Sequence, residues 1–177
     1  MTHTLKALSI FCLFTLFSCK QEQKEIIPIA KATYKGEGVA IKSYDYNQLK
    51  HLLERKNDTV YVVNFWATWC VPCVAELPEF EKLQANYKDK KVKVLLVSLD
   101  MTKMIEKQLI PFVINKKIQS QVVILDDPDA NSWIEKINKD WSGAIPATYI
   151  YSKDKNAFFE QSFDYATLEK EMKTFLK

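Results

Sequence analysis

The sequence predicts an α/β domain whose mostly parallel sheet is covered by helices on both faces. Two observations support this: strand-like segments rich in β-branched and aromatic residues alternate with helix-like segments, and the chain closes with two short strands and a helix. Continuous apolar strands are typical of sheets buried on both faces, and strands alternating with helices favour parallel pairing. The 177 residues, 47% of them hydrophobic, suit one domain plus a short extra segment.

The elements expected in the first half of the chain follow from apolar periodicity and residue type. Tyr46, Leu49 and Leu52 fall on one helical face, and residues 59–66, shortly before the cysteine pair at 70 and 73, are mostly β-branched or aromatic. In order, we expect an extended segment over 33–43, a helix over 44–55, a strand over 59–66, a helix over 72–87 and a strand over 92–99.

The second half of the chain continues the alternation and then changes to a hairpin. A proline within the first helical segment, Pro111, is expected to interrupt it, because proline lacks the backbone N–H that a helix interior needs. In order, we expect a helix over 103–117, a strand over 121–125, a helix over 128–138, strands over 147–151 and 157–163 around a turn at 153–156, and a closing helix over 165–176.

The first residues are interpreted as a targeting segment and not as part of the fold. The apolar run over 7–17 is too short to span about 30 Å of hydrocarbon, and Leu16-Phe17-Ser18-Cys19 resembles a bacterial lipobox that ends in the lipidated cysteine. An ordinary signal peptide with a chance cysteine is the alternative. We therefore expect a lipoprotein signal peptide over 1–18, lipidation at Cys19, a flexible tether over 19–32 and the folded domain over 33–177.

The chain has four cysteines, and this division leaves two for chemistry. Cys12 would leave with the signal peptide and Cys19 would carry lipid, so Cys70 and Cys73 remain. Zinc binding is the alternative, but a structural zinc site needs about four ligands, and no second cysteine pair is present. At the start of a helix, unpaired N–H groups and the helix dipole favour a Cys70 thiolate, and Cys73, about one turn later, can reach back to resolve a mixed disulfide.

Two segments resemble known active-site motifs. Residues 64–78, which contain Trp-Cys-Val-Pro-Cys, resemble the redox centre of TlpA/ResA-type proteins in the thioredoxin-like superfamily, and residues 143–150 resemble the cis-proline loop of that group. The resemblance implies a thioredoxin-like fold with a TlpA-like insertion between the two motifs, within 100–141. That insertion is interpreted either as a partner-docking feature or as a simple extension of the sheet.

The resemblance also implies roles for individual residues. Cys70 would be the nucleophile and Cys73 the resolving thiol, and substrate would contact Trp69, Pro72, the backbone of Ile145 and a cis Pro146. Ala147 stands where threonine is common. Trp66 is assigned to core packing.

By the same resemblance, Glu76 is expected to lie near the thiols and to tune proton transfer as a partly buried carboxylate with a raised pKa. The reason is that Asn64 replaces the buried aspartate that classical thioredoxins carry before Phe-Trp-Ala. A solvated helix glutamate is the alternative reading of Glu76.

These features predict a thiol–disulfide oxidoreductase of the bacterial cell envelope, lipid-anchored and facing the periplasm. A reductase of exported proteins, supplied by an upstream membrane electron donor, is expected; the alternatives are an oxidase or isomerase, a peroxidase, and a redox-inactive binding lipoprotein. We expect a monomer without metal or other cofactor. Only three glycines are present and no basic cluster alternates with aromatics, so neither a glycine-rich phosphate loop nor nucleic-acid binding is expected.

Overall fold

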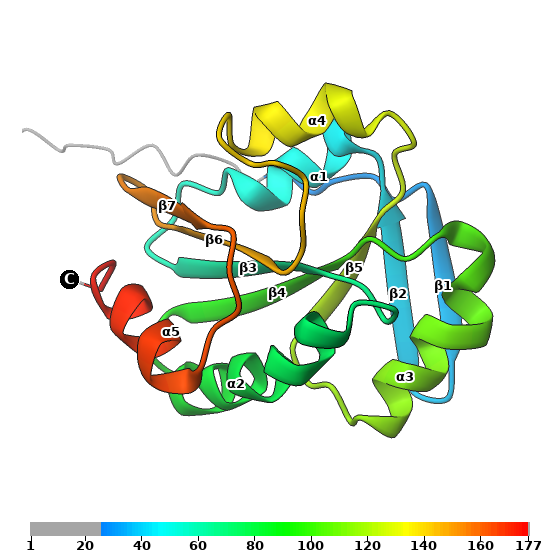
Figure 1. The fold of residues 1–177 in the computed structure, drawn as a ribbon, viewed down its shortest axis with the longest axis horizontal. Coiled ribbons are helices and arrows are strands. Elements are labelled where there is room, and N and C mark those ends of the chain that lie inside the picture. The colour runs from blue at the N-terminus through cyan, green and yellow to red at the C-terminus, as the bar shows by residue number, and fades with distance from the viewer. Residues whose placement is uncertain (1–25, 177) are drawn as a thin grey trace, which may run out of the picture.

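A seven-stranded mixed sheet forms the centre of the computed structural model, which describes residues 26–176 (Figure 1). Its strand order is β1-β2-β5-β4-β3-β6-β7. The strands are β1 (Ala32–Gly36), β2 (Val39–Tyr44), β3 (Val60–Trp66), β4 (Val92–Ser98), β5 (Gln121–Leu125), β6 (Ala147–Tyr151) and β7 (Asn156–Phe159). The helices are α1 (Tyr46–Leu53), α2 (Val71–Tyr87), η1 (Thr102–Met104), η2 (Ile105–Leu109), α3 (Ile110–Asn115), α4 (Ala130–Ile137) and α5 (Tyr165–Lys173).

The sheet topology brings the two predicted motifs together at one end of the central strands. Strands β2, β5, β4 and β3 run parallel, whereas β6 runs antiparallel to β3. The last residue of β3, Trp66, pairs with Ser98 at the end of β4, and its neighbour Phe65 pairs with Ala147 at the start of β6. The loop that follows β3 and the loop that precedes β6 therefore meet at the same end of the sheet.

Helices cover both faces of the sheet, as expected for continuously apolar central strands. Helices α1 and α4 lie on one face, and α2, α3 and α5 lie on the other (Figure 1). Every residue of β3 is buried, with alternate side chains entering the two cores. The sequence-based prediction of an α/β fold covered on both faces is confirmed.

The segment between β4 and β5 differs in detail from the single interrupted helix expected there. It forms a short 3₁₀ helix, η1, then a π-helical turn, η2, and then α3. Pro111 lies in the first turn of α3, where its missing N–H costs little because the first N–H groups of a helix have no partner in that helix. The interruption near Pro111 was expected, whereas the 3₁₀ and π geometry was not.

Two further boundaries differ from the sequence-based predictions. The extended segment expected over 33–43 is an antiparallel hairpin, β1–β2, whose turn contains Gly38 at a positive φ of 71°. The last strand ends at Phe159 instead of residue 163. The following residues leave the sheet and bring the backbone of Phe163 to the buried side of α2.

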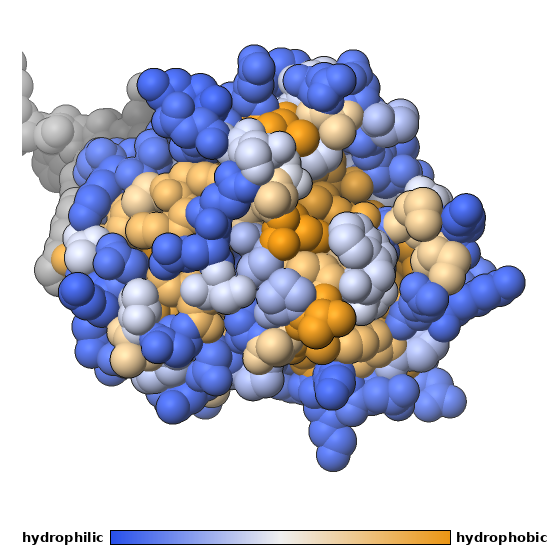
Figure 2. Space-filling view, viewed as in Figure 1, coloured by the Kyte–Doolittle hydropathy of each residue, from blue (hydrophilic) through white to orange (hydrophobic). Residues whose placement is uncertain are grey.

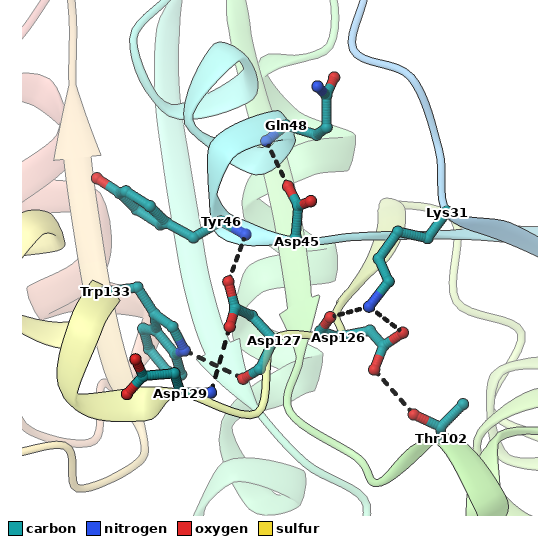
Figure 3. A network of polar contacts seen from close by, with 9 residues as sticks. All are labelled: Lys31, Asp45, Tyr46, Gln48, Thr102, Asp126, Asp127, Asp129 and Trp133. Atoms are coloured by element: carbon teal, nitrogen blue, oxygen red, sulfur yellow. Dashed lines mark hydrogen bonds and ion pairs between the residues drawn. The ribbon is translucent and has the colours of Figure 1, made fainter.

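Part of the expected tether over 19–32 contacts the domain. The Lys31 ammonium lies 2.9 Å from an Asp126 carboxylate oxygen that belongs to the network in Figure 3, and the Ile29 N–H donates to the Gln48 side chain at 2.8 Å. Residues 1–25, which include the expected signal peptide and Cys19, lie outside the described residues. Within residues 26–176, no helix is long and apolar enough to cross a membrane.

Candidate active site

The loop from β3 to α2 places Cys70 at the start of a helix. The Cys70 N–H donates to the Ala67 carbonyl at 3.1 Å, which closes a tight turn after the buried strand. Cys70 is the N-cap residue of α2, and its Sγ accepts a hydrogen bond from the Cys73 N–H at 3.3 Å. Pro72 lies in the first helical turn, where proline is tolerated. The N–H groups of this turn can therefore stabilise negative charge on the Cys70 sulfur.

The two cysteines are joined in a disulfide with an S–S distance of 1.99 Å. Cys70 is 6% exposed and Cys73 is fully buried. Of the two sulfurs, that of Cys70 is the one that an incoming thiol or disulfide can reach. The order of attack, Cys70 first and Cys73 second, stays a prediction.

The loop before β6 lies against the disulfide. The Ile145–Pro146 peptide bond is cis, as the resemblance implied, and the Cys70 Sγ lies 3.7 Å from the Ile145 carbonyl oxygen. This loop is anchored by Trp141, whose indole N–H donates to the Ala144 carbonyl at 2.8 Å and whose ring packs on Phe65. No sequence pattern singled out Trp141, because its contacts depend on tertiary packing.

Glu76 is buried on the side of α2 that faces the sheet, with an exposed fraction of 3%. Its Oε1 accepts a hydrogen bond from Asn64 Nδ2 at 2.8 Å, and its Oε2 accepts one from the Phe163 N–H at 2.7 Å. Burial raises the pKa of Glu76 above its ordinary value, and the two hydrogen bonds oppose part of that rise. Glu76 is thus a buried carboxyl group and not a solvated one.

An apolar surface surrounds the disulfide. Trp69 is 59% exposed, Val71 is also exposed, and Ile145 is half-buried. Figure 2 shows apolar surface over the start of α2 and the loop that precedes β6. Trp66 is fully buried against Phe112, in agreement with its assignment to the core.

Asp100 is a second buried carboxylate beside the cysteine loop, and no sequence motif singled it out. It lies just beyond β4 and accepts hydrogen bonds from the N–H and hydroxyl of Thr68 and from the hydroxyl of Ser98. An acidic residue after a strand is too common in sequences to signal such a contact by itself.

Comparisons with known proteins agree with this geometry. A model of the AhpC/TSA family matches residues 33–157. Thiol-disulfide oxidoreductase ResA of Oceanobacillus iheyensis is 51% identical over 89 residues, or 50% of this chain and 42% of ResA. Thioredoxin-like protein YneN of Bacillus subtilis is 37% identical over 90 residues, or 50% of this chain and 48% of YneN. The match therefore spans about half the length of these curated relatives.

The fold is also similar to that of solved structures. A thiol:disulfide interchange protein of the thioredoxin family from Chlorobium tepidum superposes with a TM-score of 0.58 at 18% identity. The superposition covers 85% of this chain and 97% of that one. The thioredoxin-like fold expected from the two motifs is confirmed.

Proposed function

Because the chain belongs to the AhpC/TSA family, we propose that it is a thiol–disulfide oxidoreductase whose redox centre is the Cys70–Cys73 pair. The observation that carries this proposal is the position of the pair. The more accessible sulfur caps the first turn of α2 and lies against the cis-proline loop, where a second polypeptide can approach.

In the reducing direction, the reaction is two successive thiol–disulfide exchanges. The Cys70 thiolate attacks one sulfur of a substrate disulfide; the new S–S bond forms as the substrate bond breaks, and the departing substrate thiolate takes up a proton. Cys73 then loses its proton and attacks the Cys70 sulfur, which releases the second substrate thiolate. Two electrons pass to the substrate, and the protein ends in the disulfide form that the structure shows.

Glu76 is suited to accept and return the proton of the buried thiol. It lies three residues after Cys73 on α2, hence on the same helical side, and burial raises the pKa of its carboxyl group. A carboxyl group with a raised pKa holds a proton closer to neutral pH than a solvated one does. Its buried hydrogen-bond partners, Asn64 and Phe163, hold the carboxyl group in place.

The substrate is proposed to be an extended segment of an exported protein that contains a disulfide. The backbone of Ile145 would pair with that segment, as in the addition of a strand to a sheet edge, while Trp69 and Pro72 contact its side chains. We further propose that Cys19 is lipidated and that the protein faces the periplasm as a monomer. An upstream electron donor in the membrane would reduce it.

The direction of electron transfer separates the main alternatives. Thioredoxin-type reductases have potentials of about −270 mV, whereas strongly oxidising relatives lie at about −120 mV. Equilibration of the Cys70–Cys73 pair with glutathione buffers measures this quantity. A potential near the lower value supports a reductase, and one near the higher value would assign an oxidase or isomerase instead.

Trapping of mixed disulfides tests the proposed order of attack. In a Cys73→Ser variant the second exchange is blocked, so covalent complexes between Cys70 and its substrates should accumulate in the cell envelope. The Cys70→Ser variant is the matched control and should trap far fewer. If neither variant traps a partner, the proposed mechanism is wrong; peroxide consumption by the reduced protein would then point to a peroxidase.

A further inference from the structure

We infer that Asp100 is a positioning residue for Cys70, and that it acts through Thr68 on the turn that carries Cys70 to the start of α2. This inference deepens the proposed function and rests on it, since it concerns the reactivity of the same thiol. Among residues 26–176, no hydrogen bond joins Asp100 to either sulfur; its partners are Thr68, in the segment that precedes Cys70, and Ser98 at the end of β4.

The hydrogen bonds of Asp100 connect the cysteine loop to the end of β4. The side chain is 3% exposed. Its oxygens lie 3.1 and 3.2 Å from the Thr68 nitrogen, and Oδ1 also accepts the Thr68 hydroxyl. The Ser98 hydroxyl donates to Oδ2 at 2.9 Å. A buried carboxylate costs free energy unless donors surround it, and here the donors are neutral groups of the cysteine loop and of the end of β4.

These bonds fix the turn beside Cys70. Thr68 lies between Ala67 and Cys70, which are joined by the hydrogen bond that closes the turn. The neighbouring strand is tied just before this point, where the Leu99 N–H donates to the Trp66 carbonyl at 2.8 Å. The Asp100 side chain therefore continues the connection between β3 and β4 beyond their last backbone hydrogen bond.

The position of the turn decides how well the Cys70 sulfur caps α2. The Cys73 N–H lies 3.3 Å from that sulfur, a contact that favours the thiolate over the thiol. If Thr68 were released, the turn could shift and the cap would weaken. A weaker cap raises the pKa of the Cys70 thiol and slows its reactions at neutral pH.

Two variants separate positioning from the charge of Asp100. Thr68→Val removes the hydroxyl link but keeps the carboxylate, and Asp100→Asn removes the charge and replaces one acceptor oxygen with a donor. If Asp100 positions the turn through Thr68, both substitutions should raise the pKa of the Cys70 thiol and slow its alkylation. Loss of the negative charge alone would instead lower the pKa of Cys70, and only in Asp100→Asn. Thr68→Ser, which keeps the hydroxyl group, should be alkylated at close to the wild-type rate.

The measurement is the pH dependence of iodoacetamide alkylation of Cys70 in the reduced full chain. For Thr68→Val and Asp100→Asn we expect alkylation at pH 7 to slow by roughly 2- to 10-fold, because a smaller fraction of the Cys70 thiol is ionised. The matched control is Thr102→Val, because the Thr102 hydroxyl bonds Asp126 and not the cysteine loop (Figure 3). It should alkylate like the wild type.

Three outcomes would overturn the inference. The first is a folded Thr68→Val variant that is alkylated at the wild-type rate. The second is faster alkylation of Asp100→Asn with no change in Thr68→Val. The third is a Thr102→Val control that slows as much as Thr68→Val does. Thermal unfolding of each variant establishes that it is folded, and Thr68→Val keeps the test intact if Asp100→Asn does not fold. Failure of the proposed function is distinct, because it would appear as a wild-type protein that exchanges no disulfides.

Discussion

The side-chain amide of Asn64, on the central strand β3, donates a hydrogen bond at 2.8 Å to the carboxyl group of Glu76 on α2. Both residues are buried. The pair joins the strand that leads into the cysteine loop to the helix that follows it. A proton gained or lost by Glu76 therefore acts on both elements that hold Cys70 and Cys73.

Replacing Glu76 with glutamine should change how the thiols respond to pH. Glutamine keeps the size of the side chain but cannot exchange a proton, so the alkylation profile of the reduced protein should lose the inflection caused by Glu76. Alkylation of both cysteines between about pH 5 and 9 measures this effect. Glu79→Gln, on the same helix, is the control. A Glu76→Gln profile identical to that of the wild type would remove Glu76 from the site.

The same substitution should flatten the pH dependence of stability. Because burial raises the pKa of Glu76, the folded protein binds this proton more tightly than the unfolded chain does. The contribution to the free energy of unfolding is then fully present below the ordinary carboxyl pKa and is lost as pH rises through the raised value. Urea unfolding should show the stability of Glu76→Gln increasing relative to the wild type across that window. A constant difference would contradict the raised pKa.

Asn64→Ala should raise the pKa of Glu76 further and destabilise the fold. The substitution leaves Glu76 Oε1 without its buried donor, and loss of one partner in a buried hydrogen bond costs about 1–3 kcal/mol. Chemical denaturation measures the loss. Asn86→Ala is the control: its amide bonds the Tyr165 hydroxyl at an exposed position, so its effect should stay within about 0.5 kcal/mol. Equal losses in the two variants would count against a special role for the Asn64–Glu76 pair.

Gly36→Ala should destabilise the hairpin at the sheet edge. A Cβ atom at Gly36 would clash with the Ile110 Cγ2 atom, so the Ile110 side chain or α3 would have to move. Overpacking of this kind costs typically about 1–3 kcal/mol. In the Ile110→Ala background the clash is removed, so the added effect of Gly36→Ala should be much smaller there. If the changes in the free energy of unfolding were additive in the double variant, Gly36 and Ile110 would not contact each other, which would contradict the packing of β1 on α3.

The sequence predicted best what depends on local pattern. The strand that leads into Cys70, the helix that follows and the Ile145–Pro146 loop each carry a compact signature, and the structure contains all three. The resemblance also implied a partly buried Glu76, and the structure buries it. These features depend on residues that are close together along the chain.

What the sequence did not predict depends on distant segments. Asp100 and Trp141 act on the cysteine loop and the cis-proline loop through contacts that exist only once β4 and β6 flank β3. The Phe163 N–H reaches Glu76 across 87 positions of the chain. The π-helical turn of η2, which contacts β1, likewise has no local sequence pattern that predicts it.

The most direct test of the proposed activity is the reduction of insulin disulfides by dithiothreitol in the presence of the full chain. The proposed function predicts that the wild-type protein accelerates this reaction and that Cys70→Ser returns it to the uncatalysed rate, because the attacking sulfur is gone. A wild-type rate equal to the uncatalysed one, or full acceleration by Cys70→Ser, would contradict the assignment of Cys70 as the nucleophile of a thiol–disulfide oxidoreductase.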